Sequence, residues 1–273
     1  MRYLSVPEVA ERWGISAGSV RTYCALGRIE GAYLSGNTWN IPENAIRPEE
    51  IKRTGGKPSE ILPLLIREKK VKRQSGFYDW LRTELTYHST CLEGREADPE
   101  DTEKHLKCVD MMIDRADYEL SERLIRQLYG TLKNGADQSA PVRSAMGKYK
   151  KSPNEFFGRQ TVLPGDVAAC MKKLLADYNA VEKKTADGLL DFHVRFMAIQ
   201  PFQDDNGRIA RLLLFKECLR NRIVPFIISK DLKRFYEDGL QNWAANPFLL
   251  RNTCRIAQER FQEKMDFHRI TYK

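Results

Sequence analysis

A short polar loop near residue 200 carries the residues best suited to chemistry in this sequence. The segment from Gln200 to Arg211 reads QPFQDDNGRIAR, with apolar helical patterns before and after it. A loop that leads into a helix N-terminus presents unpaired backbone N–H groups, which attract anions. Arg208 and Arg211 lie three residues apart, so both guanidinium groups are expected to face one polyphosphate. Asp204 beside them provides the oxygen ligands that a magnesium ion prefers.

The loop requires a scaffold, and hydrophobic periodicity predicts one that is mainly α-helical. From residue 61 onward, apolar residues recur at helical spacing in nearly every segment. Residues 147–164 interrupt this pattern with glycines, prolines and aromatic or β-branched residues. That composition predicts a short β-hairpin, or flap, between helices. We therefore expect a mainly α domain over residues 61–273, in which two helices hold the loop.

The N-terminal region, residues 1–48, is predicted to form a separate small domain. Ser5 and Glu8 form a capping-box pattern at the start of a first helix, which Gly14 ends. A second helix is predicted over Ala17–Ala25, and the segment GAYLSGNTWNIP predicts a hairpin. Two short helices at a tight turn, followed by a hairpin wing, resemble the winged helix-turn-helix of MerR and excisionase proteins. Residues 49–60, with a Gly-Gly pair and a proline, predict a linker.

DNA binding is one interpretation of this small domain. On the second helix, Arg21, Thr22 and Tyr23 are the residues expected to face DNA. A DNA-binding surface needs an excess of positive charge, whereas four arginines balance four glutamates over residues 1–46. A docking or oligomerisation module is the alternative interpretation, and the sequence leaves both open.

The loop and its flanks resemble the active-site motif of Fic proteins, H-P-F-x-[D/E]-G-N-G-R-x-x-R. The matching residues are Pro201, Phe202, Asp204, Asn206, Gly207, Arg208 and Arg211. The resemblance extends over about residues 61–265 and implies a Fic helical core with a β-hairpin flap. Fic domains transfer AMP from ATP to a hydroxyl group of a target protein. The resemblance therefore implies ATP and Mg²⁺ as cofactors.

By this resemblance, each matched polar residue of the loop has a role. Asp204 would hold the magnesium ion. Asn206 and Gly207 would form the cradle for the phosphates. Arg208 and Arg211 would grip the phosphates, with Arg211 on the outermost one.

Two positions depart from the motif, and both predict weaker AMP transfer. Gln200 stands where the family has the histidine that takes the hydroxyl proton. An amide cannot accept a proton near neutral pH, and a positioned general base is worth about 10²–10⁴ in rate. Asp205 replaces the first glycine of the cradle, where its side chain and charge oppose a close approach of phosphate. Asp205 itself, His88 and His193 are the alternative bases, although His193, seven residues before Gln200, is expected to pack in the helical bundle.

A second pattern lies ahead of the loop, near residues 87–96. Ser89, Glu93 and Gly94 fit [S/T]-x-x-x-E-[G/N], the pattern of the inhibitory helix in many Fic proteins. In the family this glutamate pairs with the last arginine of the motif, here Arg211, and prevents productive seating of the outer phosphate. Arg95 stands where the family usually has asparagine. The alternative is that Ser89 and Glu93 are only i, i+4 neighbours on a surface helix.

The sequence leaves three functions open. The first is a nucleotide-binding pseudoenzyme or crippled AMP transferase that Glu93 inhibits. The second is an active transferase of altered chemistry, and the third is a DNA-binding regulator with the Fic domain as sensor or dimeriser. The expected partners are a target protein hydroxyl, registered by the flap residues Gly147, Lys148 and Tyr149, or an antitoxin-like or self partner, including a homodimer. Six scattered cysteines and the lack of an 18-residue apolar run predict a cytoplasmic protein without a membrane span.

Overall fold

The computed structural model describes residues 2–25, 29–36, 38–47, 61–71, 75–96, 98–134 and 147–270. The chain divides into two compact units, Met1–Gly55 with Arg234–Thr253 and Gly56–Lys233 with Cys254–Lys273. The predicted linker, residues 49–60, lies outside the described residues. None of the described helices combines the length and the apolar composition that crossing a bilayer requires.

The N-terminal part of the first unit contains two short helices and a small antiparallel sheet. Its elements are β1 (Tyr3–Leu4), α1 (Val6–Trp13), α2 (Ala17–Ala25), β2 (Tyr33–Ser35) and β3 (Thr38–Pro42), and the strand order is β1-β3-β2. The Ser5 backbone N–H donates to Glu8 at 2.7 Å, which is half of the predicted capping box. Gly14 ends α1 in the left-handed conformation, with φ of 63°, and so permits the tight turn into α2.

Tyr23 lies in the core of this unit, which corrects the expectation that its side chain faces DNA. Its relative exposure is 1%, and that of Val20 is 0%. The short helix α2 buries one face, and the i, i+3 spacing places Val20 and Tyr23 on that face. Arg21 on the same helix is exposed. The side chain of Thr22 lies outside the described residues.

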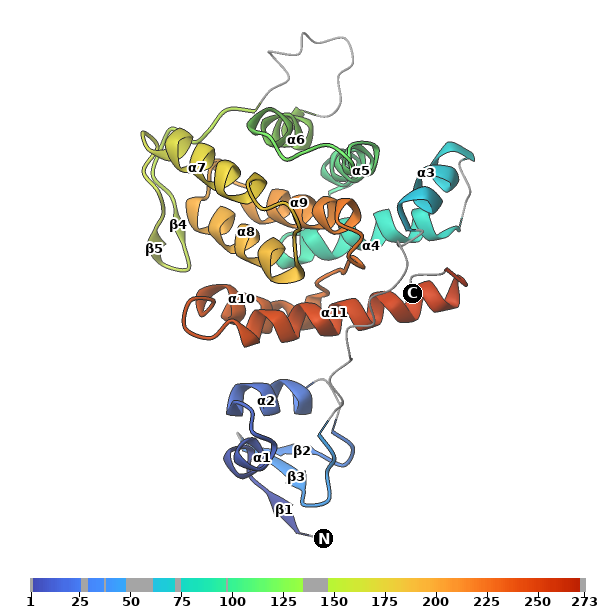
Figure 1. The fold of residues 1–273 in the computed structure, drawn as a ribbon, viewed down its shortest axis with the longest axis vertical. Coiled ribbons are helices and arrows are strands. Elements are labelled where there is room, and N and C mark those ends of the chain that lie inside the picture. Colours follow the sequence, from blue (N-terminus) through green and yellow to red (C-terminus); the bar gives the residue numbers. More distant parts are fainter. Residues whose placement is uncertain are drawn as a thin grey trace. The chain divides into compact units, whose positions relative to one another are not determined.

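The second unit is built mainly from helices, which confirms the predicted mainly α fold. Its elements are α3 (Ile61–Val71), α4 (Phe77–Leu92), α5 (Pro99–Asp114), α6 (Glu122–Asn134), β4 (Glu155–Phe156), β5 (Arg159–Gln160), α7 (Val167–Asn179), α8 (Ala186–Ile199), α9 (Asn206–Arg220) and η1 (Lys230–Leu232). The chain continues with α10 (Lys233–Gln241) and α11 (Phe248–Phe267). α9 packs against α4, α5, α6 and α8 (Figure 1).

The central position of α9 follows from its composition. Every residue from Asn206 to Leu219 is buried, and the sequence IARLLLFKECL is apolar on most of its faces. A helix that is apolar all round requires neighbours on all sides. Two of the buried charges inside it form a pair, because Lys216 lies 2.6 Å from Glu217, and the Tyr178 hydroxyl also donates to Glu217 at 2.6 Å.

The predicted flap forms only in part. Within residues 147–164, β4 and β5 pair around Phe157 and Gly158, whose φ angles of 51° and 70° suit a tight two-residue hairpin turn. Residues 147–150 have no regular secondary structure, and Gly147 lies against α6. The Gly147 N–H donates to the Arg126 carbonyl at 2.8 Å, and a Cβ at this position would meet that oxygen at 3.0 Å. Gly147 is therefore required for the close approach of this segment to α6.

Candidate active site

Residues with left-handed backbone conformations bound the loop between α8 and α9. Gln200 caps the end of α8 with φ of 48°, and Asp205 precedes α9 with φ of 56°. Asn206 closes the loop between them, because its Nδ2 donates to the Phe202 carbonyl and its Oδ1 accepts from the Phe202 N–H, both at 2.8 Å. Phe202 is fully buried and stacks on Tyr129, with ring centroids 3.9 Å apart. The loop is thus held in one shape by packing and by side-chain hydrogen bonds.

The bonds of Asn206 show how its side chain holds the loop. Both atoms of its carboxamide are engaged with the loop backbone, and its relative exposure is 3%. The side chain therefore shapes the cradle by holding the loop backbone. What remains for an anion is the set of backbone N–H groups in the first turn of α9, which have no partner within the helix.

The Gln200 side chain has only local bonds. Its Nε2 donates to the Met197 carbonyl at 2.9 Å, and its relative exposure is 8%. His193, on the same helix, is buried and hydrogen-bonds the Ala210 carbonyl through Nδ1 at 3.2 Å. Burial, and then the nearby charge of Arg211, lower the pKa of His193 to about 3. His193 therefore packs in the bundle as expected, and it is not placed as a substitute base.

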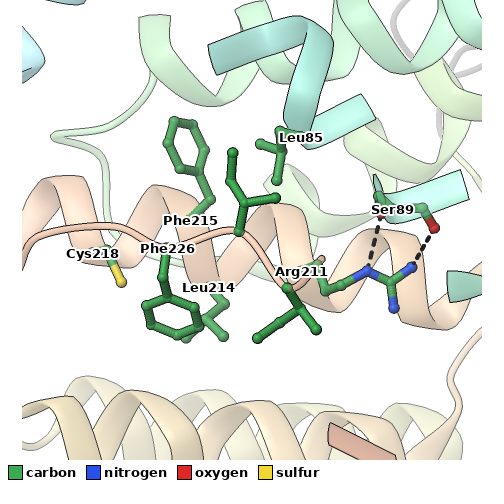
Figure 2. Close-up of a pocket in the computed structure, with 9 residues that line it drawn as sticks. Leu85, Ser89, Arg211, Leu214, Phe215, Cys218 and Phe226 are labelled. Carbon is green, nitrogen blue, oxygen red and sulfur yellow. Dashed lines mark hydrogen bonds between the residues drawn. The ribbon is translucent and has the colours of Figure 1, made fainter. Parts of the chain in front are cut away.

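At the start of α9, Glu93 and Arg211 form the contact that the sequence pattern predicts. Arg211 Nη2 donates to Glu93 Oε1 at 2.6 Å. Its Nε donates to the Ser89 hydroxyl at 3.0 Å, and Nη2 also reaches the Ser89 carbonyl at 2.9 Å (Figure 2). A Cβ at Gly207 would collide with Glu93 Oε1. The Glu93 carboxylate thus lies directly on the first turn of α9, where a helix N-terminus favours an anion.

The end of α4 sets the position of this carboxylate. Glu93 is the C-terminal cap of α4, and Gly94 follows with φ of 71°, so the chain turns away directly after the glutamate. Behind Arg211, a pocket lined by residues such as Leu85, Leu214 and Phe226 is mainly apolar (Figure 2). Its polar lining residues, Ser89 and Arg211, already bond each other, and Arg211 also bonds Glu93.

Arg208 does not share a site with Arg211, which corrects the expectation that both face one polyphosphate. Arg208 is fully buried, and its Nη1 donates to Asp101 Oδ1 at 2.8 Å and to Asp205 Oδ1 at 3.4 Å. Asp101 belongs to α5, whereas the partners of Arg211 belong to α4 and its cap. Because helices cover α9 on several sides, a shift of three residues directs the two guanidinium groups to different neighbours.

Asp204 and Asp205 lie in a cluster of charged residues. Asp204 accepts from the Tyr129 hydroxyl at 2.7 Å, and Lys133 Nζ lies 2.8 Å from Asp204 Oδ2 and 2.9 Å from Asp205 Oδ2. Arg95 Nη1 lies 3.0 Å from Asp205 Oδ1. Burial raises the pKa of Asp204, but the hydrogen bonds from Lys133 and Tyr129 outweigh it, so the net pKa is lowered. Asp204 is therefore held in its ionised form.

The same cluster argues against Asp205 as a substitute base. Its side chain is 2% exposed, and each of its carboxylate oxygens already contacts at least one cation. A carboxylate in this arrangement has no free oxygen directed at an incoming hydroxyl group. Asp205 instead links the segment after α4, through Arg95, to the start of α9.

The residues around Asp204 do not fit a magnesium ion in this arrangement. Mg²⁺ is bound by oxygen ligands with freely available lone pairs, such as carboxylates and phosphates. Here Tyr129 and Lys133 each bond one of the Asp204 oxygens, and the Lys133 ammonium group places a positive charge beside them. Among the described residues, no group of three or more His, Cys, Asp or Glu side chains is arranged to hold a metal.

Lys150 connects the flap to the loop and was not singled out by the sequence pattern. Its Nζ lies 2.7 Å from Asn154 Oδ1, 2.7 Å from Thr161 Oγ1 and 3.2 Å from the Ile199 carbonyl. Its backbone N–H donates to the Pro201 carbonyl at 2.9 Å. Lys148 is exposed and Tyr149 is half-buried, with the Arg126 guanidinium over its ring. A lysine in a loop carries no spacing signal, so only the tertiary structure identifies this connection.

The other contacts of the site were not predicted from the sequence, and the sequence carried a signal for one of them but not for the others. Arg95 and Asp205 both depart from the Fic pattern, and their opposite charges were a usable signal for a pair. Lys133 and Tyr129 lie one turn apart on α6, far from the motif in sequence. Nothing in their local sequence distinguishes them from other residues of an amphipathic helix.

Comparisons with known proteins identify a family over part of the chain and a similar fold. Residues 119–217 match the model of the Fic/DOC family. The fold is similar to that of a Fic domain-containing signalling protein from Bacteroides thetaiotaomicron, at a TM-score of 0.57 and 20% identity, over 78% of this chain and 98% of that chain. A Fic family protein from Desulfovibrio desulfuricans is similar at a TM-score of 0.51 and 15% identity, over 79% of this chain and 77% of that chain.

Fic-1 from C. elegans is similar at a TM-score of 0.51 and 16% identity, over 77% of this chain and 72% of that chain. Among curated proteins, no significant match is found. At these identities the solved structures show the fold, and the family model identifies the sequence region. The match covers α6 to α9, which includes the loop and the residues that hold Asp204. The chain therefore carries a Fic domain of the Fic/DOC family.

Proposed function

We propose that this protein binds a nucleotide in its Fic domain, transfers AMP poorly, and is held in an inhibited state by Glu93. The observation that carries the proposal is the position of the Glu93 carboxylate against Gly207 and Arg211. A carboxylate there uses the same helix terminus and the same guanidinium group that an outer phosphate would use. Glu93 and the phosphate have like charges, so both cannot occupy this position.

Nucleotide binding is supported by what the first turn of α9 offers once Glu93 leaves. Its backbone N–H groups are directed out of the helix end, and Gly207 allows an oxygen to approach the backbone closely. Arg211 already makes charge-assisted bonds to an anionic oxygen in this position. A purely structural helix terminus has no need for this combination.

Poor transfer is supported by the chemistry of Gln200. Its carboxamide bonds the Met197 carbonyl and cannot remove a proton from a target hydroxyl. The missing general base corresponds to about 10²–10⁴ in rate. Asp205 adds a fixed negative charge beside the cradle, although Arg95 and Lys133 offset it. The target would be a hydroxyl group of a partner protein or of a second copy of this chain.

The proposal is tested with α-phosphate-labelled ATP, the wild type and three variants. We expect no or weak self-labelling by the wild type and by Glu93→Gly, and strong labelling by Gln200→His with Asp205→Gly when combined with Glu93→Gly. Glu96→Gly is the matched control, because Glu96 is an exposed glutamate of the same segment without a role in the site. Strong labelling by the wild type would contradict impaired transfer, and equal ATP affinity of wild type and Glu93→Gly in calorimetry would contradict inhibition.

A second candidate function, DNA binding, has one supporting observation. Arg21 is exposed on α2, the second helix of a helix–turn–helix followed by a hairpin. A mobility shift on the promoter of the protein's own gene tests it. We expect a complex that weakens as salt rises and that Arg21→Ala weakens further, whereas no complex at low salt would favour a docking module.

A further inference from the structure

Lys133 occupies the space between two carboxylates at the start of α9. Its Nζ lies 2.8 Å from Asp204 Oδ2 and 2.9 Å from Asp205 Oδ2. One turn earlier on α6, the Tyr129 hydroxyl bonds the other oxygen of Asp204 at 2.7 Å. One face of α6 therefore holds both Asp204 oxygens, and the packing of Tyr129 on Phe202 fixes that face against the loop.

This arrangement excludes a divalent cation from the same place. A magnesium ion would need the Asp204 oxygen that Lys133 now contacts, and it would lie next to a positively charged ammonium group. Asp205 makes the exclusion stronger, because a second carboxylate holds Lys133 from the other side. The motif of the family has a glycine at position 205, which has no side chain to do so.

We propose that the Lys133 ammonium group takes the place of the divalent cation, so that this Fic domain binds a nucleoside diphosphate or triphosphate without Mg²⁺. The inference rests on the nucleotide binding proposed above. Lys133 supplies the positive charge next to the first turn of α9, and its side chain is 37% exposed, so it can reach a phosphate oxygen while it still contacts Asp204. Asp205 is the second carboxylate that forms an ion pair with Lys133 and so fixes its position.

Metal binding without nucleotide tests the position of Lys133 directly. The probe is Mn²⁺, followed by electron paramagnetic resonance, and the variant is Lys133→Met, which keeps the length of the side chain and removes its charge. We expect no Mn²⁺ uptake by the wild type and uptake of one ion by Lys133→Met, which Asp204→Asn abolishes. Lys107→Met is the control and should behave as the wild type, because Lys107 lies on α5, its side chain is 41% exposed, and it pairs with Glu103 of the same helix.

Two outcomes of this experiment overturn the inference. Mn²⁺ uptake by the wild type that Asp204→Asn abolishes would show that Lys133 does not exclude the ion. Absence of uptake in both Lys133→Met and Lys133→Gln, with unchanged circular dichroism, would show that the two carboxylates are not a cation site.

ATP binding in EDTA and in MgCl₂ tests the nucleotide part, in the Glu93→Gly background that frees the helix terminus. We expect the affinity to differ by less than about threefold between the two buffers, and Lys133→Met to lose at least about tenfold in EDTA and to recover in MgCl₂. A loss of tenfold or more in EDTA with Lys133 present overturns the inference. If no variant binds ATP, the proposed function fails, and the Mn²⁺ result still decides whether Lys133 holds the cation position.

Discussion

The two ends of the loop between α8 and α9 differ in the number of side chains on which the expected reaction depends. At the end of α8, proton transfer would depend on one side chain, and Gln200 makes bonds only to Met197. At the start of α9, many charges meet: Asp204, Asp205, Glu93, Arg95, Lys133, Arg208 and Arg211. A single substitution removes a proton acceptor, whereas anion binding shared among a helix terminus and several side chains survives individual changes. This difference is the basis of the proposal that nucleotide binding is retained and inhibited while AMP transfer is weak.

Restoring the base gives the largest expected effect on this comparison. In the Glu93→Gly background, Gln200→His should raise the rate of AMP transfer by about 10²–10⁴, because it returns a proton acceptor to the end of α8. Transfer is measured as label incorporated per unit time. Gln200→Asn, which changes the side chain without adding a base, is the control. Equal rates for His and Asn at this position would show that the start of α9, not Gln200, limits transfer.

The second prediction separates the two arginines of α9. Arg208→Met should destabilise the fold by about 3–5 kcal/mol in urea, because it leaves the Asp101 and Asp205 carboxylates without their buried partner. Arg195→Met removes an arginine that is 39% exposed, and we expect a much smaller loss. If Arg208 were a phosphate ligand, the substitution would lower ATP affinity and leave the urea midpoint unchanged.

The third prediction concerns His193, behind the Gln200 end of the loop. Its folded-state pKa of about 3 is below its unfolded value of about 6.5, so the unfolded chain takes up a proton first as the pH falls. The stability from His193 is fully present above pH 6.5 and is lost on acidification, by about 2 kcal/mol at pH 5. Urea unfolding at pH 7 and pH 5 measures this loss.

In His193→Gln the pH dependence should shrink by that amount. His88→Gln is the control, since His88 bonds Glu84 near the surface and belongs to another helix. An unchanged pH dependence in His193→Gln would mean that the pKa of His193 is the same in the folded and the unfolded chain, which would contradict the effect of burial.

The smallest effect is expected at Arg95. Its pair with Asp205 joins the segment after α4 to the start of α9, but Arg95 is 46% exposed, so the pair is worth only about 0.5–1 kcal/mol. Arg95→Ala should therefore raise ATP affinity about two- to fivefold at low salt, and less at high salt, by easing the departure of Glu93. Glu96→Ala is the control. A fall in affinity would contradict this prediction and would mean that Arg95 helps nucleotide binding, by offsetting the Asp205 charge or by contacting a phosphate.

Local patterns predicted the elements well. The helix over Ala17–Ala25, the ends of α1 and the hairpin near Gly158 follow from caps, turns and hydrophobic spacing, which act between neighbours in sequence. The burial of Tyr23 was not predicted, because periodicity does not say which face of a two-turn helix meets the core. The length of the flap was overestimated, since residues 147–150 pack on α6 instead of pairing as strands.

The sequence by itself predicted the loop and the glutamine at the position of the motif histidine, since both rest on a short pattern of nearby residues. Through the resemblance to Fic proteins it also predicted the contact between Glu93 and Arg211, which are 118 residues apart. Only the tertiary structure decided that Arg208 is buried with Asp101, that Arg95 pairs with Asp205, and that Lys133 bridges the two aspartates. These partners are separated by 107, 110 and 71 or 72 residues. Charges attract without regard to sequence distance, so the packing of α5 and α6 on α9 selects the partners.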